Sequence, residues 1–448
     1  MLAYRALFES VRMMDRPLRI RSGGPAHPGF AGSAVLPHHG LHGKAVRRSS
    51  LSSDTKPDPE AKALHPTVKA VAMVSFFTDF STQMVGPLLP LFLTSVLGAP
   101  VWVYGLMEGI GAGIAAVLKV FAGWLSDRLG HRKSLMFVGY TISNLIKPVF
   151  ALTGGWGSVL ALRQVERVGK GFRTAPRDAL LADVTTPANR GRSFGFRRAM
   201  DSLGAALGPL AATSILWASH ERIRLVFALT LIPGLAAIPF LLRIQENRSV
   251  NAPRQRSRPH LGLSRLPTRF RRFMVPAGLL ALATFSQGFL VLRARSLGMP
   301  VLVIPLSYFV MNGVASVLSM PSGHLGDRIG HRTLLLGGFA LLAFTYAGFA
   351  FATAALWMWP LMALYGVFIA LVDGNQKVYA TALLAHTDRG TGLGTLNAVL
   401  GFAELAASLG GGLLWTTVGP QAPFLAGAIL SCVAFIALWL LTDRVVVS

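Results

Sequence analysis

Twelve apolar segments follow one another along the chain from about Val68 onward, and each is long enough to cross a bilayer as a helix. A transmembrane helix needs about 20 residues to cross about 30 Å of hydrocarbon. The segments are rich in Gly, Ala and Leu and do not alternate polar with apolar residues, which favours helices over barrel strands. Their approximate cores are 70–96, 101–125, 134–153, 156–180, 194–218, 223–242, 273–295, 301–322, 333–353, 356–384, 392–416 and 421–441. The sequence therefore predicts an all-α integral membrane protein with twelve transmembrane helices.

The charge composition agrees with this prediction. Only 14% of the residues are charged, against about 25% in a typical soluble domain. The formal net charge of +24 would suit a nucleic-acid-binding protein if the basic residues formed one solvated stripe. Most of them instead lie in short gaps between the apolar segments, so we expect no nucleic-acid partner.

Patterns of catalytic or metal-binding residues are lacking in the sequence. The single cysteine, Cys432, permits neither an intrachain disulfide nor a CxxC redox pair. No phosphate-binding G-x-x-x-x-G-K-[ST] loop occurs, and no group of histidines and acids has the spacing of a metal site. We therefore expect no enzymatic activity, no metal and no cofactor.

Basic residues gather on the even-numbered connections between the segments. Those connections hold Arg128, Arg132, Lys133, Arg190, Arg192, nine arginines within 243–272, Arg328, Arg332 and Arg389, whereas the odd-numbered ones hold only Arg222, Arg224, Arg293 and Arg295. Because cytoplasmic loops carry an excess of Lys and Arg, we expect the even connections and both termini on the cytoplasmic side of the inner cell membrane. Six tryptophans fall at the opposite ends of their segments, as one half of an aromatic belt does.

The first 65 residues differ from the rest of the chain. They mix arginines with Gly, Pro, Ser and His and contain no continuous apolar stretch. Residues 1–65 are therefore predicted to form a disordered basic cytoplasmic tail, or to reflect a start codon chosen too far upstream. An organelle transit peptide is the alternative, which Glu9, Asp15 and Asp54 weaken because such peptides are poor in acids.

The connection between the second and third segments recurs 200 residues later, between the eighth and ninth. The first copy reads Gly123-Trp-Leu-Ser-Asp127-Arg128-Leu-Gly130-His131-Arg132, and the second reads Gly323-His-Leu-Gly-Asp327-Arg328-Ile-Gly330-His331-Arg332. Such a repeat predicts two pseudo-symmetric six-helix halves with a pathway between them. We expect the halves at 66–243 and 273–442, joined by a basic cytoplasmic linker at 244–272.

The repeated loop resembles motif A of the major facilitator superfamily, G-x-x-x-D-R-x-G-x-R. Other stretches resemble a poorly characterised prokaryotic branch of that superfamily, above all Gly169-Lys170-Gly171-Phe-Arg173-Thr-Ala-Pro176-Arg177-Asp178-Ala-Leu. The resemblance implies the major facilitator fold and solute transport, but no particular substrate.

Motif A also makes physical sense at a turn on the cytoplasmic face. Its glycines allow tight turning, its aspartate can accept hydrogen bonds from a helix N-terminus, and its arginines can bridge to carboxylates on neighbouring helices. We therefore predict a cytoplasmic gate formed by Gly123, Asp127, Arg128, Gly130 and Arg132, and by Gly323, Asp327, Arg328, Gly330 and Arg332. The alternative is a basic topology signal without a gating role.

Several ionisable residues lie within the predicted spans of the first half, where each costs roughly 2.5–3.5 kcal/mol near the membrane centre if it faces lipid. We predict that six of them line a substrate cavity or carry protons: Asp79, Glu108, Lys147, Arg163, Glu166 and Arg167. Arg163 aligns with the arginine of the superfamily's motif B, R-x-x-Q-G-x-G, which is associated with proton coupling in related carriers. The alternative is an internal salt-bridge lattice of Asp79, Glu108, Arg163, Glu166 and Arg167.

In the fifth segment, Gly204-Ala-Ala-Leu-Gly208-Pro209 resembles the core of motif C, which is typical of antiporters in the superfamily. Small residues at this spacing also allow two helices to approach closely, so Gly204, Gly208 and Pro209 are predicted to form a helix-packing surface. In the second half, Asp373 and Lys377 lie one helical turn apart and Glu404 stands alone.

We therefore expect a secondary active transporter that works by alternating access, with a proton-coupled antiporter that exports a small solute as the first hypothesis. One alternative is a facilitator or importer of an anionic or metal-chelate solute, because Arg and Lys are in excess along the fourth segment. Another is a transport-inactive membrane sensor or assembly factor. The expected partners are a small-molecule substrate, protons and the lipid bilayer, and we expect a monomer.

Overall fold

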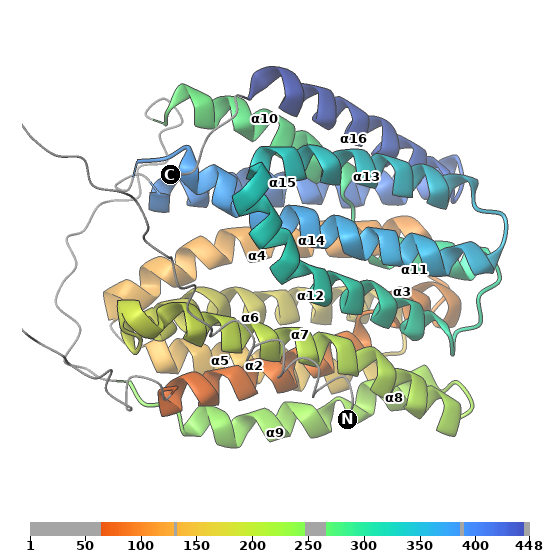
Figure 1. Ribbon diagram of the computed structural model, residues 1–448. Helices are drawn as coiled ribbons and strands as arrows, with labels where there is room; N and C mark the ends of the chain where they lie inside the picture. Colours follow the sequence, from red (N-terminus) through yellow and green to blue (C-terminus); the bar gives the residue numbers. More distant parts are fainter. Residues whose placement is uncertain (1–63, 130–131, 247–265, 386–388, 443–448) are drawn as a thin grey trace, which may run out of the picture. The chain divides into compact units, whose positions relative to one another are not determined.

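The computed structural model describes residues 64–129, 132–246, 266–385 and 389–442, and within these ranges the regular structure is entirely helical (Figure 1). The predicted tail up to residue 63, most of the predicted linker (247–265), Gly130 and His131 lie outside the described residues. Each of the twelve predicted segments corresponds to one helical span, continuous or broken, which confirms the predicted fold class.

The first six spans contain eight α-helices, because the first and sixth are broken. They are α2 (Pro66–Val85) with α3 (Leu89–Leu91) and a π-helical turn (Phe92–Val96), α4 (Val101–Leu129), α5 (Arg132–Val149), α6 (Trp156–Asp183), α7 (Pro187–Ala218), and α8 (Ile223–Leu229) with α9 (Leu231–Leu242). The break after α2 coincides with Pro87 and Pro90, which have no backbone N–H to continue the helical hydrogen bonds.

The second six spans repeat this plan, with a break in the first of them. They are α10 (Thr268–Ala283) with α11 (Gly288–Ser296), α12 (Ile304–Ile329), α13 (His331–Phe351), α14 (Met358–Ala382), α15 (Arg389–Thr417) and α16 (Ala422–Leu441). Helix α10 starts at Thr268, before the predicted start of the second half at residue 273.

Ten helical segments of the described residues are long and apolar enough to cross a membrane. Helix α6 is not one of them, because charged side chains interrupt its apolar sequence. A helix of this kind needs other helices around it, and α6 packs against α4 and α5.

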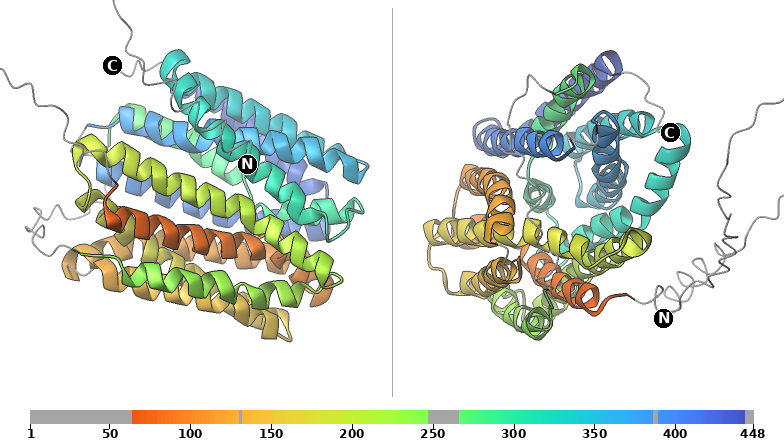
Figure 2. Two further views of the ribbon diagram at one scale, coloured as in Figure 1. Left: turned by 60° about the horizontal axis from the view of Figure 1, so that its bottom comes forward. Right: turned by 90° about the vertical axis from the view of Figure 1, so that its left-hand side faces the viewer.

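The two halves contact each other mainly through α4 against α15 and α7 against α12 (Figure 2). Glycines permit the close approach of α4 and α15: a Cβ atom on Gly109 would lie 3.0 Å from the Leu405 carbonyl oxygen, and one on Gly412 would lie 3.0 Å from the Trp102 Cα. The backbones of the two halves are therefore in direct contact along this seam.

Candidate functional site

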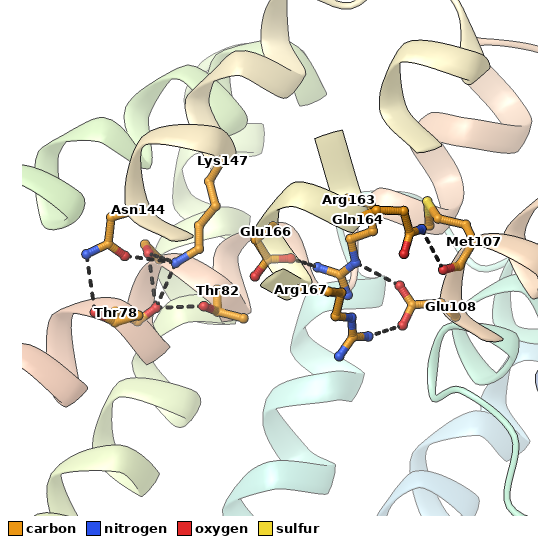
Figure 3. Close-up of polar contacts among 11 residues, drawn as sticks. Thr78, Thr82, Met107, Glu108, Asn144, Lys147, Arg163, Gln164, Glu166 and Arg167 are labelled. Atoms are coloured by element: carbon orange, nitrogen blue, oxygen red, sulfur yellow. Dashed lines mark hydrogen bonds and ion pairs between the residues drawn. The ribbon is translucent and has the colours of Figure 1, made fainter. Parts of the chain in front are cut away.

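Two carboxylates and two guanidinium groups form a buried ion-pair network between α4 and α6 (Figure 3). Arg163 Nε donates to Glu108 Oε1 over 2.9 Å, and Arg163 Nη1 donates to Glu166 Oε2. Arg167 Nη2 donates to the second oxygen of Glu108. Glu108 and Glu166 are 5% and 2% exposed, so the arginines replace the water that these carboxylates lose on burial.

Lys147, by contrast, has no carboxylate within bonding distance in the part of the chain that the structure describes. Its Nζ donates to the Thr78 carbonyl oxygen (3.1 Å), Ser81 Oγ (2.6 Å) and Asn144 Oδ1 (3.2 Å), and the side chain is 1% exposed (Figure 3). Ser81 Oγ gives its own proton to the Thr78 carbonyl, so all three groups act as acceptors. Three acceptors match the three N–H bonds of an ammonium group, and the cluster ties α5 to α2.

Asp79 lies on α2 about 20 Å from the start of the helix, taken at 1.5 Å per residue, and is half-buried. Among the described residues it has no hydrogen-bond or ion-pair partner, so it does not belong to the network around Glu108. Four charged groups are close enough to interact with its carboxylate electrostatically: Lys147, Lys170, Arg177 and Asp201. Within the first half, the structure thus separates Asp79 from the other predicted carboxylates.

The basic face of α6 continues beyond Arg167, where our sequence analysis assigned no role. The Arg173 guanidinium lies 4.9 Å from the ring centre of Tyr140 on α5. Arg177 Nε donates to Asp178 Oδ1 over 3.0 Å. Lys170, Arg173 and Arg177 follow Arg163 and Arg167 at helical spacing, and this periodicity was the signal available in the sequence.

One carboxylate of the second half lies near this basic helix, and a second one lies near α7. Glu404 on α15 interacts electrostatically with Arg167 and Lys170, and Asp373 on α14 does so with Lys377 and Arg198. Glu404 and Asp373 are exposed. Across the part of the chain that the structure describes, no ion pair joins the two halves. The second half therefore adds carboxylates to a site that the sequence analysis had confined to the first half.

At the end of the bundle predicted to face outward, tyrosines contact polar side chains. Tyr104 Oη on α4 lies 2.8 Å from Ser286 Oγ, just before α11. Tyr308 donates to Gln287 over 2.6 Å. Of the hydrogen bonds between described residues, the one between Tyr104 and Ser286 is the only one that joins the halves, so the halves are held together at this end.

The first copy of the predicted gate is described only in part. Arg132 forms an ion pair with Asp183 at the end of α6, as expected for an arginine that bridges to a neighbouring helix. The Glu246 carboxylate accepts a hydrogen bond from the Arg132 backbone N–H (2.7 Å), at the positive end of the α5 dipole. The side chains of Asp127 and Arg128, and any contacts of Gly123, lie outside the described residues, as does Gly130 itself.

In the second copy, Gly330 separates α12 from α13 with a φ of 91°, a conformation that favours glycine. Asp327 Oδ1 lies 3.3 Å from His331 Nε2. Arg332 bridges to no carboxylate of the described ranges; it donates to the Trp439 carbonyl (2.8 Å) and Thr442 Oγ1 (2.9 Å) at the end of α16. Arg328 has no hydrogen-bond or ion-pair partner among the described residues, and no atom lies within 4 Å of a Cβ on Gly323.

The predicted packing residues lie between α7 and α2. A Cβ atom on Gly204 would lie 2.5 Å from the Phe76 carbonyl oxygen, and one on Gly208 would lie 2.5 Å from that of Phe80. Both positions therefore require glycine for the observed approach of the helices, and Pro209 follows inside α7.

No group of three or more His, Cys, Asp and Glu side chains in the described ranges could hold a metal ion. The site consists of charged and polar side chains from helices of both halves, and its groups can bind protons and charged or polar solutes.

Comparison with known proteins agrees with this architecture. The sequence pattern described as Major Facilitator Superfamily matches residues 71–383 and, in an overlapping match, residues 289–448. An uncharacterised MFS-type transporter of Methanocaldococcus jannaschii is 32% identical over 396 residues, which cover 87% of this chain and 98% of that protein. An uncharacterised protein of Mycobacterium tuberculosis is 27% identical over 341 residues, with coverage of 74% and 80%.

Solved structures show the same fold. The nucleoside transporter NupG has a TM-score of 0.68 at 14% identity and covers 83% of this chain and 98% of its own. A D-xylose–proton symporter has a TM-score of 0.67 at 15% identity, with coverage of 85% and 98%. The family pattern, the archaeal relative and the twelve-span architecture agree that this is a transmembrane transporter rather than an enzyme, and the chain belongs to the major facilitator superfamily.

Proposed function

We propose that the protein is a proton-coupled secondary active transporter and that Asp79 is its proton-carrying group. The observation that carries the proposal is the lack of any hydrogen-bond or ion-pair partner for Asp79 among the described residues, in the middle of a membrane-spanning segment. A carboxylate outside any ion pair can gain and lose a proton without leaving a buried cation unpaired.

Glu108 and Glu166 are less suited to carry a proton, because both belong to buried ion pairs. Protonation of either one would leave Arg163, and in the first case also Arg167, as buried cations with fewer partners. Such a loss is strongly unfavourable in a low-dielectric interior. These four residues are better suited to hold α4 against α6.

Antiport with export of a small solute is our first hypothesis for the direction of transport. Its support is the resemblance of Gly204, Gly208 and Pro209 to the antiporter motif, together with their position between α7 and α2. The second hypothesis is import or facilitated passage of an anionic or metal-chelate solute. Its support is the row of basic side chains on α6, of which Lys170 and Arg173 have no carboxylate within bonding distance among the described residues.

We further propose that the chain is a monomer in the inner cell membrane, with both termini in the cytoplasm and the predicted gate motifs on the cytoplasmic side. The stretch of α6 that begins at Gly169-Lys170-Gly171 supports its assignment to the poorly characterised prokaryotic branch of the superfamily. The repeated motif A loops support a gate on that side, with Arg132 and Arg332 joining neighbouring helices.

The test is transport in proteoliposomes that contain the purified full chain. Drugs, sugars, organic acids and metal chelates are screened with and without a pH gradient, and the first solute that accumulates becomes the reporter. With this solute, Asp79→Asn should abolish accumulation driven by the pH gradient but retain exchange of labelled for unlabelled solute across the membrane. The neutral side chain cannot carry a proton, yet alternating access is preserved.

Glu221→Gln is the matched control for this experiment, because it also converts a carboxylate to an amide, at an exposed position in the connection between α7 and α8 and outside the site. It should keep accumulation dependent on the pH gradient. Wild-type accumulation by Asp79→Asn, with unchanged pH dependence, would rule out Asp79 as the proton carrier.

A further inference from the structure

The geometry points to an oxyanion-binding site on α6, formed by Lys170 and Arg173 beside Asp79, which receives a carboxylate or phosphate group of the transported solute. The inference rests on the proposed transport function and deepens its anion hypothesis, since it names the residues that would recognise the cargo. Lys170 and Arg173 lie on successive turns of one helix, so their side chains can reach a common ligand.

Arg173 is a buried cation without a hydrogen-bond or ion-pair partner among the described residues. Its side chain is 4% exposed, its Nε has no hydrogen-bond acceptor, and no ion pair involves it among the described residues. The face of the Tyr140 ring is its only described polar or charged contact. Buried guanidinium groups are normally paired or hydrogen-bonded, because an unpaired one loses its hydration without compensation. An oxyanion would provide the missing acceptors, and guanidinium binds carboxylate and phosphate through parallel hydrogen bonds.

Lys170 provides the accessible side of the site. It is exposed although it lies in the middle part of a membrane-spanning helix, and its ammonium has no described partner. Because α6 packs against α4 and α5 and its charge would be costly in lipid, the exposed ammonium is best placed to meet a solute in the pathway.

The charged groups around Lys170 are compatible with the binding of an anion. On its own helix it interacts with Arg167, Arg173 and Glu166, on α2 with Asp79, and on α15 with Glu404. Glu166 is already bound by Arg163, and Glu404 and Asp79 are not in contact with Lys170. The cations thus outnumber the carboxylates that directly bind them, as a site for an anionic ligand requires.

Asp79 links this site to protons. Its carboxylate interacts with Lys170, and also with Lys147 on α5, Arg177 on α6 and Asp201 on α7. An ionised Asp79 weakens the positive field that attracts an oxyanion, whereas a protonated Asp79 does not. Anion binding and protonation should therefore reinforce each other, which favours movement of the anion and the proton in the same direction.

The experiment measures equilibrium binding to the purified full chain in detergent, without a gradient or turnover. The probes are radiolabelled inorganic phosphate and succinate, with chloride as a competitor at equal ionic strength. Lys170→Gln and Arg173→Gln should each weaken binding about tenfold or more, the size expected for the loss of a charged hydrogen bond. Asp79→Asn should tighten it about tenfold, the order expected when one nearby negative charge is removed in a protein interior.

Three control variants keep the result interpretable. Lys170→Arg preserves the charge and should retain most of the binding, which separates recognition from loss of folding. Arg173→Lys preserves the charge but cannot form the parallel hydrogen bonds of a guanidinium, so its binding should lie between those of the wild type and Arg173→Gln. Arg243→Gln removes an exposed cation at the end of α9 and should leave binding unchanged.

Binding of either probe that depends on Lys170 and Arg173 supports the site. Absence of such binding for both probes, or equal binding by the wild type and both glutamine variants, overturns it. A failure of the proposed proton coupling is recognised separately, because it would appear as unchanged pH-driven accumulation by Asp79→Asn in proteoliposomes.

Discussion

Individual charges in the first half fall into two groups that differ in their partners. Glu108 and Arg163 are held in a buried network, whereas Asp79, Lys170 and Arg173 make no ion pair with a described residue. A buried ion pair fixes the position of both side chains, so members of the first group suit a structural role. Members of the second group can change their protonation or their ligand without disrupting the helix packing.

The network around Glu108 should therefore be needed for stability. Glu108→Gln leaves Arg163 and Arg167 with one buried carboxylate fewer, and we expect a loss of about 3–5 kcal/mol, seen as a clearly lower melting temperature of the purified protein. Glu404→Gln, at an exposed carboxylate without an ion pair, should leave the melting temperature nearly unchanged. Equal melting temperatures of the two variants would show that the network does not hold α4 and α6 together.

At the scale of helices, the third and sixth spans of each half are joined by one kind of contact. A cation near the start of the third span donates to a backbone carbonyl near the end of the sixth. Lys133 Nζ donates to the Leu242 carbonyl at the end of α9, and Arg332 donates to the Trp439 carbonyl near the end of α16. The carbonyls at a helix C-terminus carry partial negative charge and have no partner within the helix, which makes them good acceptors for these cations. Basic residues at the end of each motif A loop, or directly after it, thus attach one helix to another.

Helix α7 offers a test of close packing at two glycines. Gly208→Ala brings a methyl group against the Phe80 carbonyl, so α2 and α7 must separate and the melting temperature should fall. Gly195→Ala lies on the same helix, where no atom is within 4 Å of the new Cβ, and should be neutral or stabilising by up to about 1 kcal/mol through helix propensity. A stable Gly208→Ala variant with normal transport would contradict the packing role of this motif.

At the scale of the whole molecule, the two halves are joined differently at the two ends of the pathway. The described hydrogen bond between the halves, which joins the Tyr104 and Ser286 hydroxyl groups, lies at the end predicted to face outward. The exposed charges Lys170 and Glu404 face each other from different halves without contact. We expect alternating access to break this hydrogen bond, so a change at Tyr104 should shift the balance between conformations.

Tyr104→Phe removes that hydrogen bond, worth about 0.5–1.5 kcal/mol, and should increase the outward-open population by up to about tenfold. Spin labels at Trp156 and Leu356, in a Cys432→Ser background, report the distance between the halves at this end. Tyr308→Phe is the control, because Tyr308 bonds Gln287 within its own half. Identical distance distributions for the wild type and Tyr104→Phe would contradict this role of Tyr104.

The sequence alone determined the twelve helical spans and the twofold repeat. Hydrophobic length and the motif A spacing are properties of short stretches, so they can be recognised before any helix is placed against another. The breaks at Pro87 and Gly330 also follow from local backbone chemistry. Which ionisable residues meet could not be determined in this way. It depends on the rotation of each helix and on contacts between residues far apart in the chain.

Only the tertiary structure placed Glu108 between Arg163 and Arg167 and left Asp79 outside that network. It also brought Glu404 of the second half to face Lys170, a relation with no local signature. The physical reason is that membrane insertion responds to the average polarity of a segment, whereas charge pairing responds to the positions of single atoms on neighbouring helices.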